Sequence, residues 1–207
     1  MTDCPCSEKK QIRKGPGLLM DCGVWCQDSG PTTDVDIYYK SEYRVGHPIK
    51  ETDNVRALWI AQQLPGGPGT MLDVGCGDGR AMRFAANRGW EVEGVEPDEL
   101  TRKEASGFGM VYKSLDEVTG HYDCLVASHV IEHIPDAPGF LRRLRNYADD
   151  FIFIVPIESY GFPHLWGFTE TGFDQFVKCA GYKIVRKGFL PKIHYWTICK
   201  KDDKCAK

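Results

Sequence analysis

The sequence lacks the features that direct a protein to a membrane or to secretion. Its longest apolar stretch, Phe151 to Ile157, has seven residues, far fewer than the ~20 that a transmembrane helix needs. Acidic and basic residues mix at the N-terminus and no apolar core follows them, so we expect no signal peptide. Nine cysteines without a secretion signal indicate the reducing cytosol. We therefore expect a cytoplasmic protein with no membrane partner.

The sequence also lacks an excess of basic residues. Its 26 lysines and arginines face 29 acidic residues, which gives a net charge of −3 and no general field for holding nucleic acid. Arg142, Arg143 and Arg145 cluster on one predicted helix, and we interpret them as a solvated face. A nucleic-acid partner is therefore not indicated. A length of 207 residues fits one domain with a small appendage.

From Thr70 onward, short apolar runs alternate with helical patterns, which is typical of βαβ units and a parallel sheet. Two late runs joined by a short connection predict an open sheet of seven strands whose last strand is antiparallel. The predicted strands are Met71–Val74, Glu91–Val95, Met110–Lys113, Cys124–Ser128, Phe151–Val155, Tyr182–Lys187 and His194–Cys199. The predicted helices are Val35–Tyr43, Asn54–Leu64, Arg80–Arg88, Ala137–Tyr147 and Thr171–Ala180.

These patterns divide the chain into three parts. Residues 1–35 are rich in Cys, Gly, Pro, Asp and Thr without sustained periodicity, and we expect an irregular N-terminal arm there. Residues 36–200 form the predicted α/β domain. Residues 201–207 form a charged tail.

The most informative motif is Leu72-Asp73-Val74-Gly75-Cys76-Gly77-Asp78-Gly79, where a predicted strand runs into Gly-x-Gly-x-Gly. Its glycines permit positive φ and a close approach of the backbone to a ligand. The spacing differs from the dinucleotide pattern Gly-x-Gly-x-x-Gly. A carboxylate at Asp78 would repel a diphosphate but can face an ammonium or sulfonium group. The loop therefore favours a cationic nucleoside over NAD.

A second acidic residue supports this interpretation. Glu96 ends the next predicted strand, 19 residues after Gly77, where an acidic side chain accepts hydrogen bonds from ribose hydroxyls in nucleotide-binding α/β folds. Two such signals at the ends of neighbouring strands predict one nucleoside-cofactor site.

These motifs resemble those of the class I S-adenosylmethionine-dependent methyltransferases, especially the small stand-alone kind, over about Val55 to Cys199. The matching segments are the glycine loop, Gly94–Pro97, Lys113–Asp116, Tyr122–Asp136, Phe151–Pro156 and His164–Phe168. The resemblance implies a Rossmann-like sheet with helices on both faces and S-adenosylmethionine as the cofactor. It also implies cofactor contacts by Asp73, Gly75, Cys76, Gly77, Glu96, Pro97, Ser114, Leu115, Ser128 and His129.

Three histidines are candidates for chemistry. His129 and His133 flank Glu132 after the fourth predicted strand of the domain, and His164 lies in the loop after the fifth. Histidine suits a general base near neutral pH because its usual pKa is about 6.5. Alternatively, His133 fixes the loop by hydrogen bonds. Aromatic residues in the same region, Tyr160, Phe162, Trp166 and Phe168, either line a pocket for the acceptor or pack as lid and core.

Four cysteines lie within the first 26 residues, as Cys4-Pro5-Cys6 and Cys22-Gly23-Val24-Trp25-Cys26. Two close pairs of thiolates can form a tetrahedral structural zinc site. The spacings differ from the common Cys-x-x-Cys, and the alternative is an arm with free thiols.

The leading hypothesis is an enzyme that methylates oxygen or nitrogen in a small molecule. Two alternatives remain open: methylation of a protein or nucleic-acid component, and a regulatory module that binds S-adenosylmethionine without turnover. Neither the acceptor nor the oligomeric state can be read from the sequence, because one fold supports many chemistries.

Overall fold

A seven-stranded sheet forms the centre of the protein. The computed structural model describes residues 11–14, 17–20, 22–27, 51–160, 163–191 and 194–202. The strands of the sheet lie in the order β10-β11-β8-β7-β4-β5-β6. They are β4 Thr70–Val74, β5 Glu91–Val95, β6 Met110–Tyr112, β7 Tyr122–Ser128, β8 Ala148–Pro156, β10 Tyr182–Phe189 and β11 His194–Lys201. The last strand, β11, pairs antiparallel with both β8 and β10, while the pairs among β4 to β8 are parallel. The predicted fold class is confirmed.

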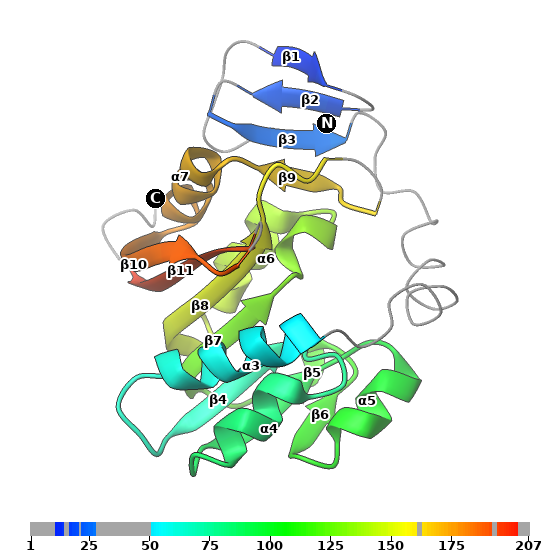
Figure 1. The fold of residues 1–207 in the computed structure, drawn as a ribbon, viewed down its shortest axis with the longest axis vertical. Helices are drawn as coiled ribbons and strands as arrows, with labels where there is room; N and C mark the ends of the chain where they lie inside the picture. Colours follow the sequence, from blue (N-terminus) through cyan, green and yellow to red (C-terminus); the bar gives the residue numbers. More distant parts are fainter. Residues whose placement is uncertain are drawn as a thin grey trace.

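Helices cover both faces of this sheet because its central strands are apolar on both sides, as buried parallel strands are. In β8, Ile152 and Ile154 pack in one core cluster with α3 (Glu51–Gln63) and α4 (Arg80–Ala86). Phe151 and Phe153 point to the opposite cluster, which contains residues of α6 (Ala137–Leu144) and α7 (Glu170–Cys179). Figure 1 shows α3 and α4 in front of the sheet and α6 behind it.

One helix of this domain was missed by the sequence interpretation. Helix α5 (Glu99–Ala105) is only seven residues long, and its Leu100 is exposed, so it has little apolar periodicity. Its start is fixed by Asp98, whose carboxylate accepts hydrogen bonds from the backbone N–H and the hydroxyl of Thr101. An Asp at the N-cap was the available signal. The predicted helix over residues 35–43 lies outside the described residues.

The prediction of an irregular N-terminal arm is wrong for residues 11–14, 17–20 and 24–27, which form strands. Strands β1 (Gln11–Lys14), β2 (Gly17–Met20) and β3 (Val24–Gln27) form an antiparallel sheet with β9 (Trp166–Phe168). This small sheet lies beside α7 at the top of Figure 1. The partner strand β9 is about 140 positions away in the sequence, and strands of four residues are too short to show a period. Tertiary pairing, which a local pattern does not reveal, decides this element.

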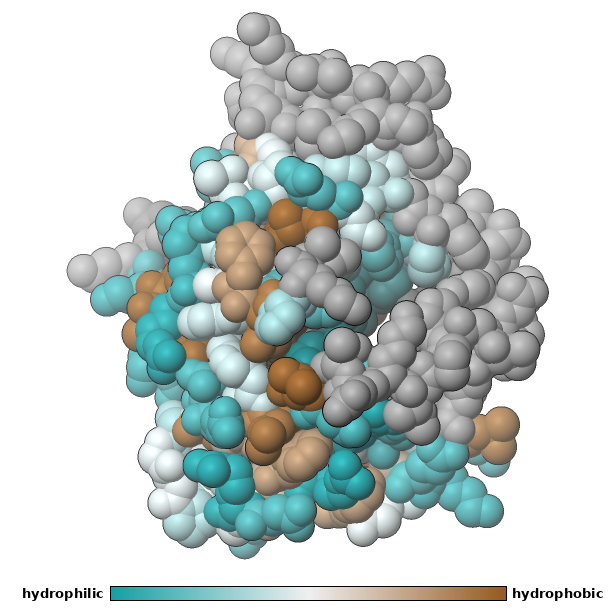
Figure 2. Space-filling model, viewed as in Figure 1, coloured by the Kyte–Doolittle hydropathy of each residue, from teal (hydrophilic) through white to brown (hydrophobic). Residues whose placement is uncertain are grey.

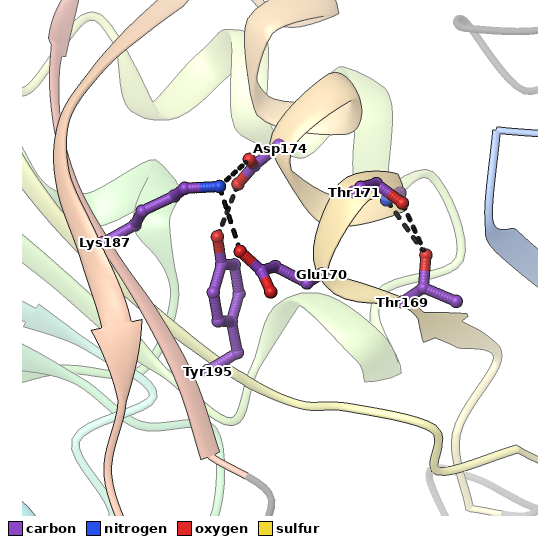
Figure 3. Close-up of polar contacts among 7 residues, drawn as sticks. Thr169, Glu170, Thr171, Asp174, Lys187 and Tyr195 are labelled. Carbon is purple, nitrogen blue, oxygen red and sulfur yellow. Dashed lines mark hydrogen bonds and ion pairs between the residues drawn. The ribbon is translucent and has the colours of Figure 1, made fainter.

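A polar cluster joins α7 to the edge of the large sheet. The carboxylate of Asp174 accepts hydrogen bonds from the Tyr195 hydroxyl at 2.7 Å and from Lys187 Nζ at 2.6 Å, and Lys187 also contacts Glu170 at 3.0 Å (Figure 3). Asp174 is 8% exposed and Tyr195 fully buried. A buried hydroxyl needs such a partner, so Asp174 anchors β11 to α7.

Replacing Asp174 with alanine is expected to lower the free energy of unfolding by about 1–3 kcal/mol, because the buried Tyr195 hydroxyl loses its acceptor. Lys187→Ala removes a side chain that is 42% exposed, so its effect should stay below about 1 kcal/mol. Urea unfolding measures both. In a Tyr195→Phe background the cost of Asp174→Ala should shrink, and an undiminished cost would refute the role of this hydrogen bond.

The visible surface carries mixed polarity. In Figure 2, hydrophobic residues appear as small groups among hydrophilic ones. Two of the exposed apolar residues, Val55 and Leu58, lie on α3. Within the described part of the chain, none of the helices has the length and apolar character needed to span a membrane.

Candidate cofactor and acceptor site

The glycine loop after β4 turns toward β5 and is fixed there by backbone hydrogen bonds. The N–H groups of Gly75 and Cys76 both donate to the carbonyl of Val95, at 2.8 and 3.1 Å. Gly75 and Gly77 have φ values of 71° and 56°, a left-handed conformation that favours glycine. A β-carbon at Gly77 would meet no atom of the described residues within 4 Å, apart from its chain neighbours. Among the described residues, the backbone of Gly77 therefore faces open space, into which a ligand can approach it closely.

Glu96 is tied directly to this loop. One carboxylate oxygen accepts the N–H of Gly77 at 3.0 Å and the other accepts the N–H of Asp98 at 2.9 Å. Burial raises the pKa of Glu96, while these two backbone hydrogen bonds oppose the rise. Each carboxylate oxygen has a further lone pair. Glu96 is thus oriented by the protein and still able to accept hydrogen bonds from a diol.

Asp73 lies at the carboxyl end of β4 and is 3% exposed. Burial, followed by the charge of Glu96, raises the pKa of Asp73 to about 7, while Arg56 on α3 acts in the opposite direction. Two carboxyl groups near one loop, with one of them buried, create a site that a cationic ligand would stabilise.

The role expected for Asp78 is not supported by its contacts. Both of its carboxylate oxygens accept hydrogen bonds from Arg80 Nε, at 3.1 and 2.8 Å. This ion pair neutralises the charge that was expected to face a sulfonium. Asp78 and Arg80 belong instead to a pocket of about 350 Å³ on the helical side of the loop, lined also by Asn54, Arg83, Glu104 and Phe108.

The loop after β7 packs on the glycine loop. A β-carbon at Gly75 would come within 2.3 Å of Val130 Cγ2. Strand β4 lies between β5 and β7, so the connections after β4 and β7 leave the sheet in opposite directions. Open α/β sheets bind ligands at such a switch point. The hydroxyl oxygen of Ser128 lies buried here without a hydrogen-bond partner among the described residues. Such an atom can form its hydrogen bond with a bound ligand.

The three histidines expected to do chemistry converge on Glu132. His129 Nδ1 and His133 Nε2 lie 3.3 and 3.8 Å from Glu132 Oε1. The rings of His133 and His164 are 4.8 Å apart. The backbone of His129 has a φ of 58°, a left-handed conformation that costs free energy for residues other than glycine. The structure thus brings together residues that the sequence separates by more than 30 positions.

The electrostatics of these histidines differ from the sequence-based expectation. Burial lowers the pKa of His129 to about 3 and that of His133 to about 4, and it also lowers the pKa of His164. Their rings are neutral at pH 7. A base with so low a pKa is poorly matched to proton abstraction at neutral pH, so the unperturbed value of about 6.5 was a misleading guide.

The remaining predicted cofactor residues have mainly structural contacts. The carbonyl of Pro97 accepts a hydrogen bond from Arg102. Ser114 caps the 3₁₀ helix η1 (Leu115–Glu117) through its hydroxyl, and Leu115 is buried in the core. Cys76 is buried beneath the loop, and burial raises its thiol pKa. Their contacts with a cofactor stay predictions.

The aromatic residues after β8 act as core. Trp166 and Phe168 are buried, and Trp166 Nε1 donates to the carbonyl of Ile134 at 2.9 Å. Tyr160 packs near Trp25 of β3. The described members of this group therefore hold the small sheet to the domain. Phe162 lies outside the described residues.

Two residues of the site were missed by the sequence interpretation. His194, the first residue of β11, has Nδ1 2.9 Å from Nε2 of His129. Arg56 on α3 acts electrostatically on Asp73, His129 and Glu132. Strand β11 lies beside β8, and this strand order brings His194 near the loop after β7. A correct prediction of that order would have indicated His194. No local motif marks Arg56.

Of the four predicted zinc ligands, only Cys22 and Cys26 lie in the described part of the chain. Cys22 is buried in the turn before β3, and Cys26 lies within that strand, half-buried. Cys4 and Cys6 fall outside it, so the predicted zinc site stays a prediction.

Comparisons with known proteins agree with this geometry. A family model described as a methyltransferase domain matches residues 52–158, just over half of the chain. The ubiquinone biosynthesis O-methyltransferase of Pseudomonas paraeruginosa is 28% identical over 115 residues, which cover 50% of this chain and 48% of the relative. That of Erwinia tasmaniensis is 33% identical over 102 residues, 43% of this chain and 42% of the relative. The chain therefore spans about half the length of these curated relatives.

Solved structures share the fold at low identity. The 1,6-didemethyltoxoflavin-N1-methyltransferase of Burkholderia thailandensis, solved with bound 1,6-didemethyltoxoflavin and S-adenosylhomocysteine, has a TM-score of 0.69 at 18% identity. The match covers 94% of this chain and 100% of that chain. The magnesium protoporphyrin IX methyltransferase of Synechocystis, solved with S-adenosylmethionine, has a TM-score of 0.64 at 17% identity, with coverages of 84% and 100%. The fold is that of the class I S-adenosylmethionine-dependent methyltransferases. With the family match, the chain belongs to the methyltransferase-domain family.

Proposed function

We propose that this chain binds S-adenosylmethionine and transfers its methyl group to oxygen or nitrogen of a small molecule. The observation that carries this proposal is the hydrogen bond from Gly77 N–H to Glu96 at 3.0 Å, which joins the glycine loop to an acidic residue beside the buried Asp73. The open space before Gly77 and the unpartnered Ser128 hydroxyl fit a ligand at this switch point.

Each of these residues has a physical role in the proposal. Glu96 accepts the ribose hydroxyls through its remaining lone pairs. Asp73 and Gly77 face the methionine part, where a carboxylate stabilises the cationic groups. The bound cofactor supplies an activated methyl group, and its in-line transfer mainly requires positioning and exclusion of water. The protein's principal task is therefore to hold donor and acceptor in line.

The acceptor belongs on the side of the loop after β7, beside His129, His133 and His164. Their low pKa values favour neutral rings, which accept or donate hydrogen bonds and orient an acceptor. A small acceptor agrees with the names of the curated relatives and of the toxoflavin enzyme. The net charge of −3 gives no support to a nucleic-acid acceptor.

Transfer is tested with isotopically labelled S-adenosylmethionine and a host extract separated by ultrafiltration. We expect the labelled methyl group to appear in the small-molecule fraction. This incorporation should require the protein and should be lost with the Asp73→Asn variant. Label confined to protein or nucleic acid would contradict the small-molecule acceptor. Cofactor binding without transfer to any fraction would favour a regulatory module.

We also propose that Cys4, Cys6, Cys22 and Cys26 bind one structural zinc ion, on the grounds of residue type and spacing. Such a site requires reduced thiols, in agreement with the cytoplasmic location that we expect. With cobalt in place of zinc, the chain should show thiolate-to-cobalt charge-transfer absorption, and Cys4→Ser/Cys6→Ser should lack it. A wild-type chain without this absorption would refute the zinc proposal.

A further inference from the structure

Glu132 is the most unusual polar residue among those described. It follows β7 in the 3₁₀ helix η2 (Ile131–His133) and is 0% exposed. Neither of its carboxylate oxygens has a hydrogen-bond partner in the described part of the chain. A buried carboxyl group without partners is costly in both of its protonation states. Its surroundings therefore point to a missing partner.

Three histidines surround this carboxylate, and the nearest ring nitrogen is His129 Nδ1, 3.3 Å from Glu132 Oε1. His133 Nδ1 lies 3.2 Å from the carbonyl of Pro163 and must donate to it, so Nε2 carries the lone pair. This Nε2 is the atom 3.8 Å from Glu132 Oε1. A carbonyl behind an imidazole is the usual arrangement for a metal-binding histidine, because it fixes the tautomer and the ring orientation.

His164 is brought to the same place by the backbone. The N–H of Leu165 donates to the carbonyl of Glu132 at 2.8 Å, which holds the segment before β9 against η2. The Nδ1 atom of His164 is buried and has no hydrogen-bond partner among the described residues. The backbone of Ser159 also makes a hydrogen bond with His164, and since Nδ1 has no partner, that bond falls to Nε2. Nδ1 is then left with its lone pair.

We propose that Glu132, His133 and His164 bind one divalent transition-metal ion, such as Zn²⁺, Co²⁺ or Fe²⁺. One ligand atom from each residue lies within 4.8 Å of the other two. Two ligands of one tetrahedral zinc ion with bonds of about 2.1 Å lie about 3.4 Å apart, so the widest pair in this group closes by up to about 1.4 Å on binding. Two imidazoles with one carboxylate form a common transition-metal set that leaves positions open.

A metal ion would satisfy more of this cluster than hydrogen bonds do. An ionised Glu132 needs donors, and the nearest ring nitrogen is His129 Nδ1, 3.3 Å from Oε1, while Oε2 has no hydrogen-bond partner in the described part of the chain. An ion would satisfy the carboxylate and Nδ1 of His164 together. Because Val130 packs on Gly75, the ion would lie beside the proposed cofactor site. If the proposed function holds, its charge there would favour an oxygen acceptor in ionised form.

Cobalt binding tests this proposal without any methyl transfer. The full chain, stripped of metal with a chelator, is titrated with Co²⁺, and the visible spectrum, the metal content and the Tm are recorded. Beside the equivalent proposed for the cysteines, which gives thiolate charge-transfer absorption, one further equivalent should bind through nitrogen and oxygen ligands and should raise the Tm. Glu132→Gln should lose this equivalent, with affinity lowered at least about 100-fold, and its Tm should no longer respond to it.

Two further variants complete the design. His164→Gln should also lose the equivalent, and it serves if Glu132→Gln does not fold. His121→Gln changes an exposed histidine that lies 3.8 Å from Asp149, and it should bind cobalt like the parent. Binding of the same nitrogen- and oxygen-ligated equivalent by both Glu132→Gln and His164→Gln would overturn the proposal, as would the lack of such an equivalent in the wild-type chain.

Discussion

Replacing Glu96 with alanine is expected to raise the Kd for S-adenosylmethionine by between about 10- and 100-fold. A hydrogen bond to a charged group contributes about 1.5–3 kcal/mol, and 1.4 kcal/mol corresponds to a factor of ten in Kd. The variant loses the proposed bonds to the ribose and also the acceptor that orients Gly77 N–H. Isothermal titration calorimetry measures the change, with the Tm of the metal- and cofactor-free chain as a check of folding.

Glu91→Ala is the matched control for this prediction. Glu91 is exposed and starts the strand that Glu96 follows, so it lies at the opposite end of β5 from the glycine loop. Its replacement should leave the Kd unchanged. Equal affinities of the wild-type chain and Glu96→Ala would refute the ribose role of Glu96.

Replacing Asp73 with asparagine is expected to stabilise the cofactor-free protein at pH 8 while weakening its binding of S-adenosylmethionine. The folded state raises the pKa of Asp73 from 3.8 to about 7, so the folded chain binds a proton that the unfolded chain releases. The stability contributed by this proton is present below about pH 4 and is lost as the pH rises to about 7. Asparagine lacks this dependence.

The free energy of unfolding of Asp73→Asn should therefore exceed that of the wild-type chain by an amount that grows with pH, toward about 4 kcal/mol at most. Urea unfolding at pH 5 and pH 8 measures it. Glu91→Gln is the control, because Glu91 is exposed at the start of β5, and its difference should vary little. If the difference in the free energy of unfolding between Asp73→Asn and the wild-type chain is the same at both pH values, the pKa of Asp73 is not raised by burial.

Asp73→Asn is expected to raise the stability of the protein and to lower its affinity for the cofactor, and this combination distinguishes a binding residue from a structural one. A buried carboxylate that costs stability without its ligand is typical of binding sites, which give up stability for function. A substitution that is only structural would not raise stability and lower cofactor affinity together.

Much of the large sheet was predictable because its strands are local apolar runs between clear breakers. The run Phe151–Val155 lies within β8, and Asp73-Val74-Gly75 marks the end of β4. The cofactor loop and its acidic partner follow from the same local pattern. The hydrogen bond between Glu96 and Gly77 is a contact that the sequence interpretation did not predict.

The features that escaped prediction depend on contacts between distant parts of the chain. Strand β3 pairs with the distant strand β9, and His194 reaches His129 only because β11 lies beside β8. Asp78 is paired with Arg80, two positions on, and a sequence does not state which of several nearby charges a carboxylate meets. The low pKa values of the histidines arise from burial, which a local sequence pattern does not report.

Calorimetric titration of the full wild-type chain with S-adenosylmethionine measures whether the glycine loop and Glu96 form a cofactor site. We expect saturable binding at one site with a Kd well below 1 mM, which is about −4 kcal/mol, and competition by S-adenosylhomocysteine. A folded chain that binds neither molecule up to millimolar concentration would show that no such site exists.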